Sequence, residues 1–252
     1  MQSLSGKTIL ITGAAGAVGQ ACLEAFREAG AKVALTDRDP SPAGLSGDEV
    51  WFQAADVTDR QAIGQVVEAA IQRFGRLDAA VLAAGIEGAV GPVEGISEAE
   101  IDAILAVNVK GTLFSLQACL APMMAEGRGS IVALASISGL VGAASLAPYV
   151  MSKHAVVGLV RAAALESGRH GVRINAVCPG PIESAMMRRL DRALSARDPS
   201  RPAARPGAAP GVPLQRYASA REVAGLIAFL CSDAAGSCHG GTYTVDGGFT
   251  AK

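Results

Sequence analysis

The chain has 252 residues, of which 50% are hydrophobic and only 4% aromatic. These values suit one α/β domain (1–252) whose buried sheet packs against small aliphatic side chains. A net charge of -1 gives no electrostatic basis for binding nucleic acid or an anionic membrane. Because there is neither a long uninterrupted apolar run nor a secretory signal, we expect no membrane span and a cytoplasmic protein.

Cysteine and histidine spacing gives no sign of a metal site. The five cysteines are an odd number at wide spacing, which suits neither a disulfide framework nor zinc binding. The three histidines are also far apart. We therefore predict reduced thiols and no metal requirement.

A strand, a glycine turn and a helix open the chain. Residues 7–12 (KTILIT) form a short β-branched run, and GAAGAVG and a helical pattern follow. Gly13 allows a tight turn, Gly16 lets the backbone approach a pyrophosphate, and Gly19 permits close packing of helix on strand. Small residues also serve ordinary turns, but this position favours dinucleotide binding.

The next strand (32–37, KVALTD) ends in Asp37, eighteen residues beyond Gly19. A carboxylate at this distance can accept hydrogen bonds from an adenosine ribose and repel a 2′-phosphate. This indicates NAD rather than NADP, although the neighbouring Arg38 could turn toward a phosphate. A solvated carboxylate with no ligand is the alternative.

Two further strands reach the same expected edge of the sheet. Residues 50–56 (VWFQAAD) deliver Asp56, which could reach an adenine amino group, and Thr58 with Gln61 predicts a capping box for a helix over 59–74. Residues 78–85 (DAAVLAAG) form the fourth strand. Ala84 and Gly85 at its end would leave no side chain between the backbone and a cofactor.

A second capping box, Ser97 with Glu100, starts a long helix that carries Asn108 among apolar neighbours. Burying an amide without partners is costly, so Asn108 is either satisfied by backbone groups or part of a polar site. Its position in the sequence leaves both possibilities open.

The most informative stretch runs from Ser136 to Lys153. Ser136 ends an apolar strand, and Tyr149 and Lys153 stand four apart at the start of a helix, so their side chains should share one face. An ammonium beside a phenol favours the charged phenolate, which would lower the pKa of Tyr149 toward a useful range for an acid or base. A solvated helix face is the alternative.

The last third contains a strand, an arginine-rich segment and a final helix and strand. Residues 172–180 (VRINAVCPG) end in Pro179 and Gly180, and residues 186–215 are so rich in Pro, Gly, Ala and Arg that we predict a mobile flap. Its six arginines could recruit an acidic substrate, but a solubilising role is favoured. Ser219 with Glu222 predicts a third capping box for a helix to residue 231, and a strand follows within 241–248. The alternation calls for a parallel sheet covered on both faces.

These motifs together resemble the short-chain dehydrogenase/reductase family over essentially the whole chain. The matching segments are TGAAGAVG (12–19), DVTD (56–59), AAG (83–85), Asn108, Ser136, YVMSK (149–153) and PG at 179. The resemblance implies a Rossmann-type, doubly wound parallel sheet of seven strands in the order 3-2-1-4-5-6-7. It also implies a homo-oligomer, a tetramer or dimer, formed through the helix carrying Tyr149 and the helix at 219–231.

The resemblance further implies roles for individual residues. Tyr149 would exchange a proton with the substrate oxygen and Ser136 would orient that oxygen. Lys153 would lower the pKa of the phenol and hold the nicotinamide ribose, and Asn108 would anchor a water that relays protons. The implied cofactor-binding residues are Gly13, Gly16, Ala17, Val18, Gly19, Asp37, Asp56, Val57, Ala84, Gly85, Tyr149, Lys153, Pro179, Gly180, Ile182 and Ser184.

Three departures from the family pattern stand out. Ala17 takes the place of a glycine, and it is small enough that we expect cofactor binding to survive. Leu82 and Ala83 replace two asparagines, so other groups must satisfy the backbone there. Ser184 replaces a threonine and keeps a hydroxyl for the nicotinamide amide.

The leading hypothesis is an NAD(H)-dependent oxidoreductase that interconverts a secondary alcohol and a ketone. A 3-oxoacyl thioester reductase is the nearest alternative, although its usual NADPH preference conflicts with Asp37. A nucleotide-sensing regulator without turnover is an alternative of another class. The segments expected to shape the substrate pocket, 87–93, 140–147 and 186–215, are rich in small apolar residues and suggest a substrate that is not highly charged.

Overall fold

The computed structural model describes residues 3–39, 47–197, 209 and 211–251. Within these residues the strands form one seven-stranded sheet in the order β3-β2-β1-β4-β5-β6-β7, and every pairing is parallel. The strands are β1 (Thr8–Thr12), β2 (Lys32–Thr36), β3 (Val50–Phe52), β4 (Ala79–Leu82), β5 (Gly129–Leu134), β6 (Val172–Pro179) and β7 (Thr242–Val245). The predicted strand order is therefore confirmed.

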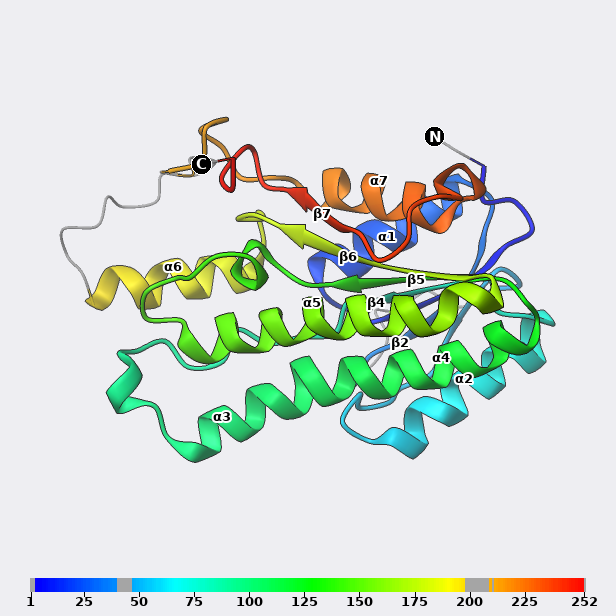
Figure 1. The fold of residues 1–252 in the computed structure, drawn as a ribbon, viewed down its shortest axis with the longest axis horizontal. Helices are drawn as coiled ribbons and strands as arrows, with labels where there is room; N and C mark the ends of the chain where they lie inside the picture. Colours follow the sequence, from blue (N-terminus) through cyan, green and yellow to red (C-terminus); the bar gives the residue numbers. More distant parts are fainter. Residues whose placement is uncertain (1–2, 40–46, 198–208, 210, 252) are drawn as a thin grey trace.

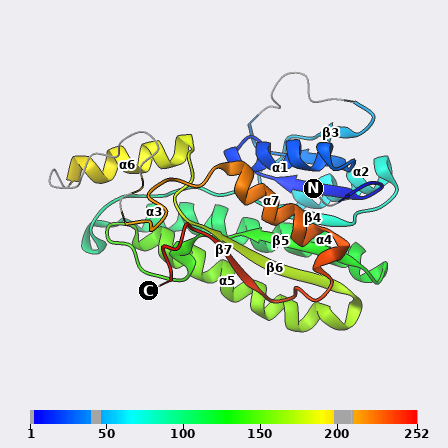
Figure 2. The same ribbon diagram turned by 90° about the horizontal axis from the view of Figure 1, so that it is seen from above.

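Helices cover both faces of this sheet (Figures 1 and 2). On one face lie α1 (Ala17–Glu28) and α7 (Ala220–Cys231), which pack against each other. On the other face lie α2 (Arg60–Phe74), α4 (Thr112–Ala125) and α5 (Ala147–Ser167). The run that leads into α4 consists of α3 (Glu98–Ile104) and a π-helical turn, η2 (Leu105–Gly111).

The core has two apolar layers because successive strand side chains point to opposite faces. Leu10, Ala80 and Ile131 contribute to the layer beneath α2, α4 and α5, whereas Ile9 and Val81 contribute to the layer beneath α1 and α7. Burial on both faces explains why the strands are continuous apolar runs rather than alternating ones.

The capping residues of three helices test the sequence predictions directly. Ser97 with Glu100 and Ser219 with Glu222 form capping boxes at α3 and α7, as predicted. The third prediction was wrong, because Asp59 is the N-cap of α2 and its carboxylate accepts from the N–H groups of Gln61 and Ala62. The Thr58 hydroxyl instead donates to Asp56 Oδ1 over 2.8 Å.

The arginine-rich segment is not irregular throughout. It begins with α6 (Ala185–Arg197), a helix with no buried residues that lies beyond the carboxyl ends of the strands (Figure 1). A parallel bridge between Ile182 and Ala218 joins the two ends of this excursion, and Leu214 N donates to Gly247 O over 3.1 Å. We call residues 183–217 the arm. Residues 198–208 and 210 lie outside the described residues, and the mobility of the segment stays a prediction.

One helical run in the described part of the chain, Glu98–Ala125, has the length and apolar character of a membrane span, with a mean hydropathy of 1.4. Its α4 portion packs against β4, β5 and α2. A core helix passes the same test, so this run is weak evidence for a membrane span.

Candidate active site

The predicted acid/base residues converge near the carboxyl end of β5. Tyr149 and Lys153 lie in the first two turns of α5, and Ser136 follows β5 by two residues. Lys153 Nζ lies 5.6 Å from the centroid of the Tyr149 ring, so the two side chains share one helix face as the spacing predicted. Lys153 is buried, and its ammonium donates a hydrogen bond of 2.9 Å to Leu134 O.

The pKa values of this pair differ from the expectation. Burial raises the pKa of Tyr149 to about 12, with a hydrogen bond to Ser136 acting in the opposite direction. Burial also lowers the pKa of Lys153 to about 8. The predicted lowering of the phenol pKa is therefore wrong for the protein alone, because desolvation is the largest influence on the phenol. The Lys153 ammonium is bonded to the Leu134 carbonyl.

The structure shows which groups satisfy the buried Asn108 amide, a question that the sequence left open. Its side chain is completely buried in η2 and binds both backbone groups of one residue, accepting from Ile86 N at 2.8 Å and donating to Ile86 O at 3.0 Å. It also donates to Ser152 Oγ at 3.0 Å, and that hydroxyl donates to Tyr149 O. The amide thus joins the segment after β4 to the helix that carries Tyr149.

The glycine turn brings the start of α1 close to the end of β4. Gly13 has a φ of +70°, and a Cβ there would come within 2.6 Å of Ala84 N. A Cβ on Gly19 would lie 2.3 Å from Gly13 O. Gly16 is the N-cap of α1, and the first turn of the helix contains no acidic side chain. Free N–H groups at a helix N-terminus fit a pyrophosphate, so this segment suits a dinucleotide.

Two acidic residues follow β2 and β3. Asp37 comes directly after β2, whereas β3 ends at Phe52, so Asp56 lies four residues beyond that strand and not at its end as predicted. Asp37 Oδ2 accepts from Ala15 N at 2.9 Å, which places its carboxylate beside the glycine turn. Asp56 accepts from the N–H and hydroxyl of Thr58, and these hydrogen bonds hold its pKa below the ordinary value. A carboxylate beside the glycine turn, as Asp37 is here, could accept hydrogen bonds from a cofactor ribose.

The other predicted cofactor-binding residues line the same edge of the sheet. Gly85 is close to the site, since a Cβ on it would lie 3.2 Å from Asn108 Oδ1. Val57 is buried and packs on Gly111. Ser184 accepts from Met187 N at the start of α6. Pro179 ends β6, Gly180 packs on Asp246, and Ile182 lies in the bridge at the base of the arm. The backbone at Ala83, where the family has asparagine, is satisfied by a bond from its N–H to Thr12 O.

An ion pair that no sequence motif indicates joins the segment after β4 to α6. Arg189 on α6 binds Glu87, with Nε 2.5 Å from Oε1 and Nη2 3.2 Å from Oε2. The two residues are 102 positions apart, so no local pattern could indicate the contact.

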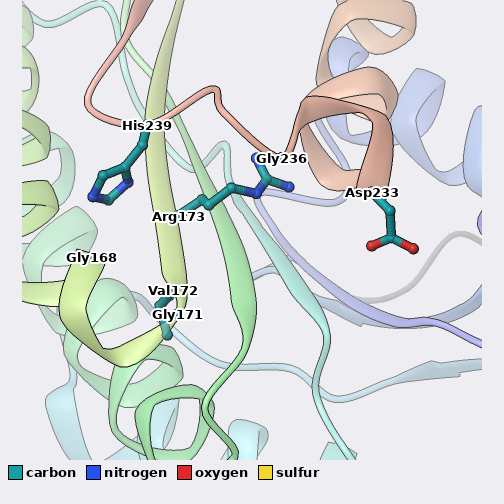
Figure 3. A pocket seen from close by; sticks show the side chains of 7 residues that line it. All are labelled: Gly168, Gly171, Val172, Arg173, Asp233, Gly236 and His239. Atoms are coloured by element: carbon teal, nitrogen blue, oxygen red, sulfur yellow. The ribbon is translucent and has the colours of Figure 1, made fainter.

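A pocket of about 380 Å³ lies at the opposite end of β6, lined by Gly168, Gly171, Val172, Arg173, Asp233, Gly236 and His239 (Figure 3). Its Arg173 guanidinium donates to Leu230 O and Ser232 O, and Asp233 pairs with Lys7. The charged groups here are satisfied by the protein itself. Among the described residues there is no cluster of three side chains suited to a metal ion.

A parallel sheet of this order, with a glycine turn at the first helix and a Ser, Tyr and Lys group beyond β5, defines a dinucleotide-binding α/β oxidoreductase. A family model described as enoyl-(acyl carrier protein) reductase matches residues 13–250. Levodione reductase of Leifsonia aquatica is 36% identical over 257 residues, which cover 97% of this chain and 94% of that protein.

Solved structures agree. A crystal structure of levodione reductase superposes with a TM-score of 0.90 and 34% identity, covering 98% of each chain. The structure of an NAD⁺-bound xylitol dehydrogenase superposes with a TM-score of 0.88 and 27% identity, covering 98% of this chain and 100% of the other. The structure of ElxO with NADP bound superposes with a TM-score of 0.84 and 27% identity, covering 98% of this chain and 99% of the other.

The chain belongs to the short-chain dehydrogenase/reductase family. It is an oxidoreductase that acts on CH–OH groups, interconverting alcohols and ketones. Members of this family bind a nicotinamide cofactor, and the neighbours above include both an NAD⁺ and an NADP complex.

Proposed function

We propose that this protein is an NAD(H)-dependent oxidoreductase that interconverts a secondary alcohol and a ketone, with Tyr149 as the acid/base. The observation that carries the proposal is that Tyr149 and Lys153 share one face of α5 beside Ser136. They lie at the carboxyl edge of the sheet, where the glycine turn and Asp37 suit a dinucleotide.

When bound, the nicotinamide supplies or accepts the hydride. The protein donates or accepts the proton. In ketone reduction the Tyr149 hydroxyl donates a proton to the substrate oxygen, and in alcohol oxidation its phenolate accepts one. Ser136 hydrogen-bonds that oxygen and stabilises the charge that develops on it. Lys153 favours the phenolate and binds the nicotinamide ribose, while Asn108 fixes the segment that faces them and anchors a water for proton relay.

The preference for NAD rests on Asp37. Its carboxylate is held beside the glycine turn by Ala15 N, where it would accept hydrogen bonds from a ribose and repel a 2′-phosphate. Arg38 pairs loosely with Asp39 at 3.8 Å, and both side chains are mostly exposed. Asp37→Ala is expected to weaken NAD binding and to improve NADP binding, measured by titration calorimetry.

The direct test is turnover of a panel of secondary alcohols with NAD by the purified protein. Tyr149→Phe is expected to abolish turnover while NAD still binds, because the phenol is the proton carrier. Tyr243→Phe, which removes a hydroxyl on β7, is the matched control and should keep activity. Unchanged turnover in Tyr149→Phe would reject the assigned acid/base.

A 3-oxoacyl thioester reductase is the second candidate, and the matching family model, whose description names an enzyme of acyl carrier protein thioesters, is the reason to include acyl thioesters in the test. Acyl thioesters and ketones should therefore be compared as substrates with NADH and NADPH. A clear preference for NADPH with a 3-oxoacyl thioester would reverse the ranking. Cofactor binding without hydride transfer to any carbonyl compound would instead favour a regulator without turnover.

The same proposal includes assembly as a homotetramer or dimer in the cytoplasm. Support comes from α5, on which Leu165 is 88% exposed and Met151 is 44% exposed. Large exposed apolar side chains on a helix are typical of a subunit interface. Light scattering of the purified protein would measure the assembly, and replacing Leu165 with Glu should shift it toward smaller species.

A further inference from the structure

The segment after β4, residues 85–91, runs beside the first turns of α5, which carry the proposed acid/base. At one end, a Cβ on Gly85 would lie 3.6 Å from Lys153 Nζ. At the other end, Gly91 N donates to Ser145 O over 2.9 Å. The acid/base tyrosine stands midway between these two contacts in the chain and shares a helix face with Lys153. The segment therefore borders the proposed site.

Helix α6 lies along this segment and contacts it at two points. Arg189 binds Glu87 through two hydrogen bonds, and a Cβ on Gly91 would lie 3.3 Å from Arg197 Nη2. On the helix these contacts are eight residues apart, which is about 12 Å. On the segment they are four residues apart, which is at most about 13 Å. The two lengths are compatible with a helix that covers the segment from one contact to the other.

The side of α6 that faces the protein is apolar. Met186, Leu190 and Leu194 recur every four residues, and all three are partly buried but none completely. Side chains at this spacing form one stripe along a helix, and Arg189 stands beside the stripe because it follows Met186 by three residues. Part of this apolar surface is therefore open next to the ion pair.

The ion pair leaves no net charge beside the stripe. Its geometry is bidentate and occupies Nε and Nη2 of the Arg189 guanidinium, which fixes orientation as well as distance. Although partial burial raises the pKa of Glu87, the hydrogen bond from Arg189 holds it below the ordinary value, so the carboxylate is ionised at neutral pH. An anionic substrate group would have to displace Glu87 from the guanidinium and would meet a like charge.

We propose that Glu87 and Arg189 determine the substrate class of this enzyme, because the pair admits uncharged, largely apolar carbonyl compounds and excludes those with an anionic group on the α6 side. Glu87 is the excluding group, since it both occupies the guanidinium and repels a second carboxylate. The inference rests on the proposed function, because it concerns the substrate of that reaction. It adds a specificity determinant outside the Ser, Tyr and Lys group.

The test compares oxo carboxylic acids with their primary amides, which have nearly the same shape but no charge. The series is built on the ketone that the wild-type protein reduces best, with the acid or amide at increasing distance from the carbonyl so that some members reach α6. The readout is the ratio of kcat/KM for the acid to kcat/KM for the amide. This ratio does not depend on the fraction of folded enzyme, and in the wild-type protein it should lie below one.

Two single variants are expected to move this ratio in opposite directions. Glu87→Gln leaves the guanidinium unpaired and should raise the ratio about threefold to tenfold. Arg189→Met leaves the carboxylate unpaired and should lower the ratio by a similar factor. Larger changes are not expected, because the Arg189 side chain is 54% exposed and water screens the charges. The double variant Glu87→Gln/Arg189→Met has neither charge and should lie between the two.

Arg188→Met is the matched control, since Arg188 is an exposed neighbour on the same helix and is not part of the ion pair. It should keep the wild-type ratio. A purely structural ion pair would change the rates with acid and amide alike. Unchanged ratios in both single variants, shifts of the same sign, or a wild-type protein that prefers the acids or does not reduce the amides would overturn this proposal alone. A wild-type protein that binds cofactor but reduces no ketone would overturn the proposed function, and this inference with it.

Discussion

Asn108 binds the N–H and the C=O of Ile86 with the two ends of one amide, at 2.8 Å and 3.0 Å. This contact fixes the segment after β4 against the helix that carries Tyr149, because the same amide nitrogen also donates to Ser152 Oγ. The side chain lies in a π-helical turn, η2, a feature that occurs frequently at functional sites. A fully buried amide with every group bonded makes the local backbone rigid.

We predict that Asn108→Leu lowers the free energy of unfolding by about 2–4 kcal/mol, because both Ile86 groups lose their partner in a buried site. Activity per folded molecule should fall by more than tenfold, since the backbone next to Tyr149 is no longer held. Urea unfolding and steady-state kinetics measure the two effects.

Asn175→Leu is the matched control for this prediction. Asn175 is equally buried in the first half of β6, where its amide donates to Cys238 O and accepts from Gly241 N. It should lose similar stability but retain turnover. Equal activity losses in the two variants would show that Asn108 serves only the fold.

Features with a local signal were predictable from the sequence. The glycine turn, the capping boxes at Ser97 and Ser219, and the shared face of Tyr149 and Lys153 depend on residues no more than six positions apart. The strand order was predicted through the family resemblance, which several motifs in chain order carried. Such signals fix the edge of the sheet where the site lies.

The failures have physical causes. At α2 the predicted N-cap, Thr58, is next to Asp59, which is the N-cap in the structure. The Thr58 hydroxyl does not cap the helix because it donates to Asp56 Oδ1. The pKa of Tyr149 depends on burial, which spacing along a helix does not report. The bond between Glu87 and Arg189 depends on the tertiary path of the arm, so it has no periodicity to detect.

The buried ammonium of Lys153 predicts a pH dependence of stability. Its pKa falls from 10.5 to about 8 on folding, so between these values the unfolded chain binds more protons and stability rises with pH. As the pH rises through this window, the free energy of unfolding of the wild-type protein should increase by on the order of 3 kcal/mol relative to that of Lys153→Met. Below the window the difference between the two proteins should stay constant with pH.

The difference between the two proteins is the informative quantity, because other groups titrate in the same range. Burial raises the pKa of the Cys22, Cys119, Cys178 and Cys231 thiols, which lowers stability above pH 9 in both proteins. Urea unfolding at several pH values gives the difference curve. A flat curve would mean that Lys153 is not desolvated as described.

A buried hydroxyl without a partner predicts a stabilising substitution. Thr36 Oγ1 at the end of β2 is buried and has no hydrogen-bond partner among the described residues. Thr36→Val replaces the hydroxyl with a methyl group of similar shape and should raise the free energy of unfolding by about 1 kcal/mol.

Thr112→Val provides the contrast for Thr36, since the Thr112 hydroxyl is buried but donates to Asn108 O over 2.7 Å. That substitution should be destabilising. Thermal unfolding of both variants therefore gives shifts of opposite sign if the hydrogen-bonding state decides the outcome.

Arg173 predicts a large stability effect far from the catalytic edge. Its guanidinium donates to three carbonyls that follow or end α7, those of Leu230 at 2.8 Å, Ser232 at 3.0 Å and Cys238 at 3.3 Å. Arg173→Met removes this donor from all three carbonyls, although Leu230 O keeps the Ser130 hydroxyl and Cys238 O keeps the Asn175 amide, and should cost about 1–3 kcal/mol. The stability of Arg173→Lys should lie between those of the wild-type protein and Arg173→Met, because an ammonium cannot span the three acceptors in one plane.

Arg128→Met, at an exposed arginine, is the control for Arg173→Met and should change stability by less than about 0.5 kcal/mol. Since the site lies at the other end of the sheet, Arg173→Met should keep the turnover of the folded enzyme. A loss of activity larger than the loss of folded protein would contradict this separation.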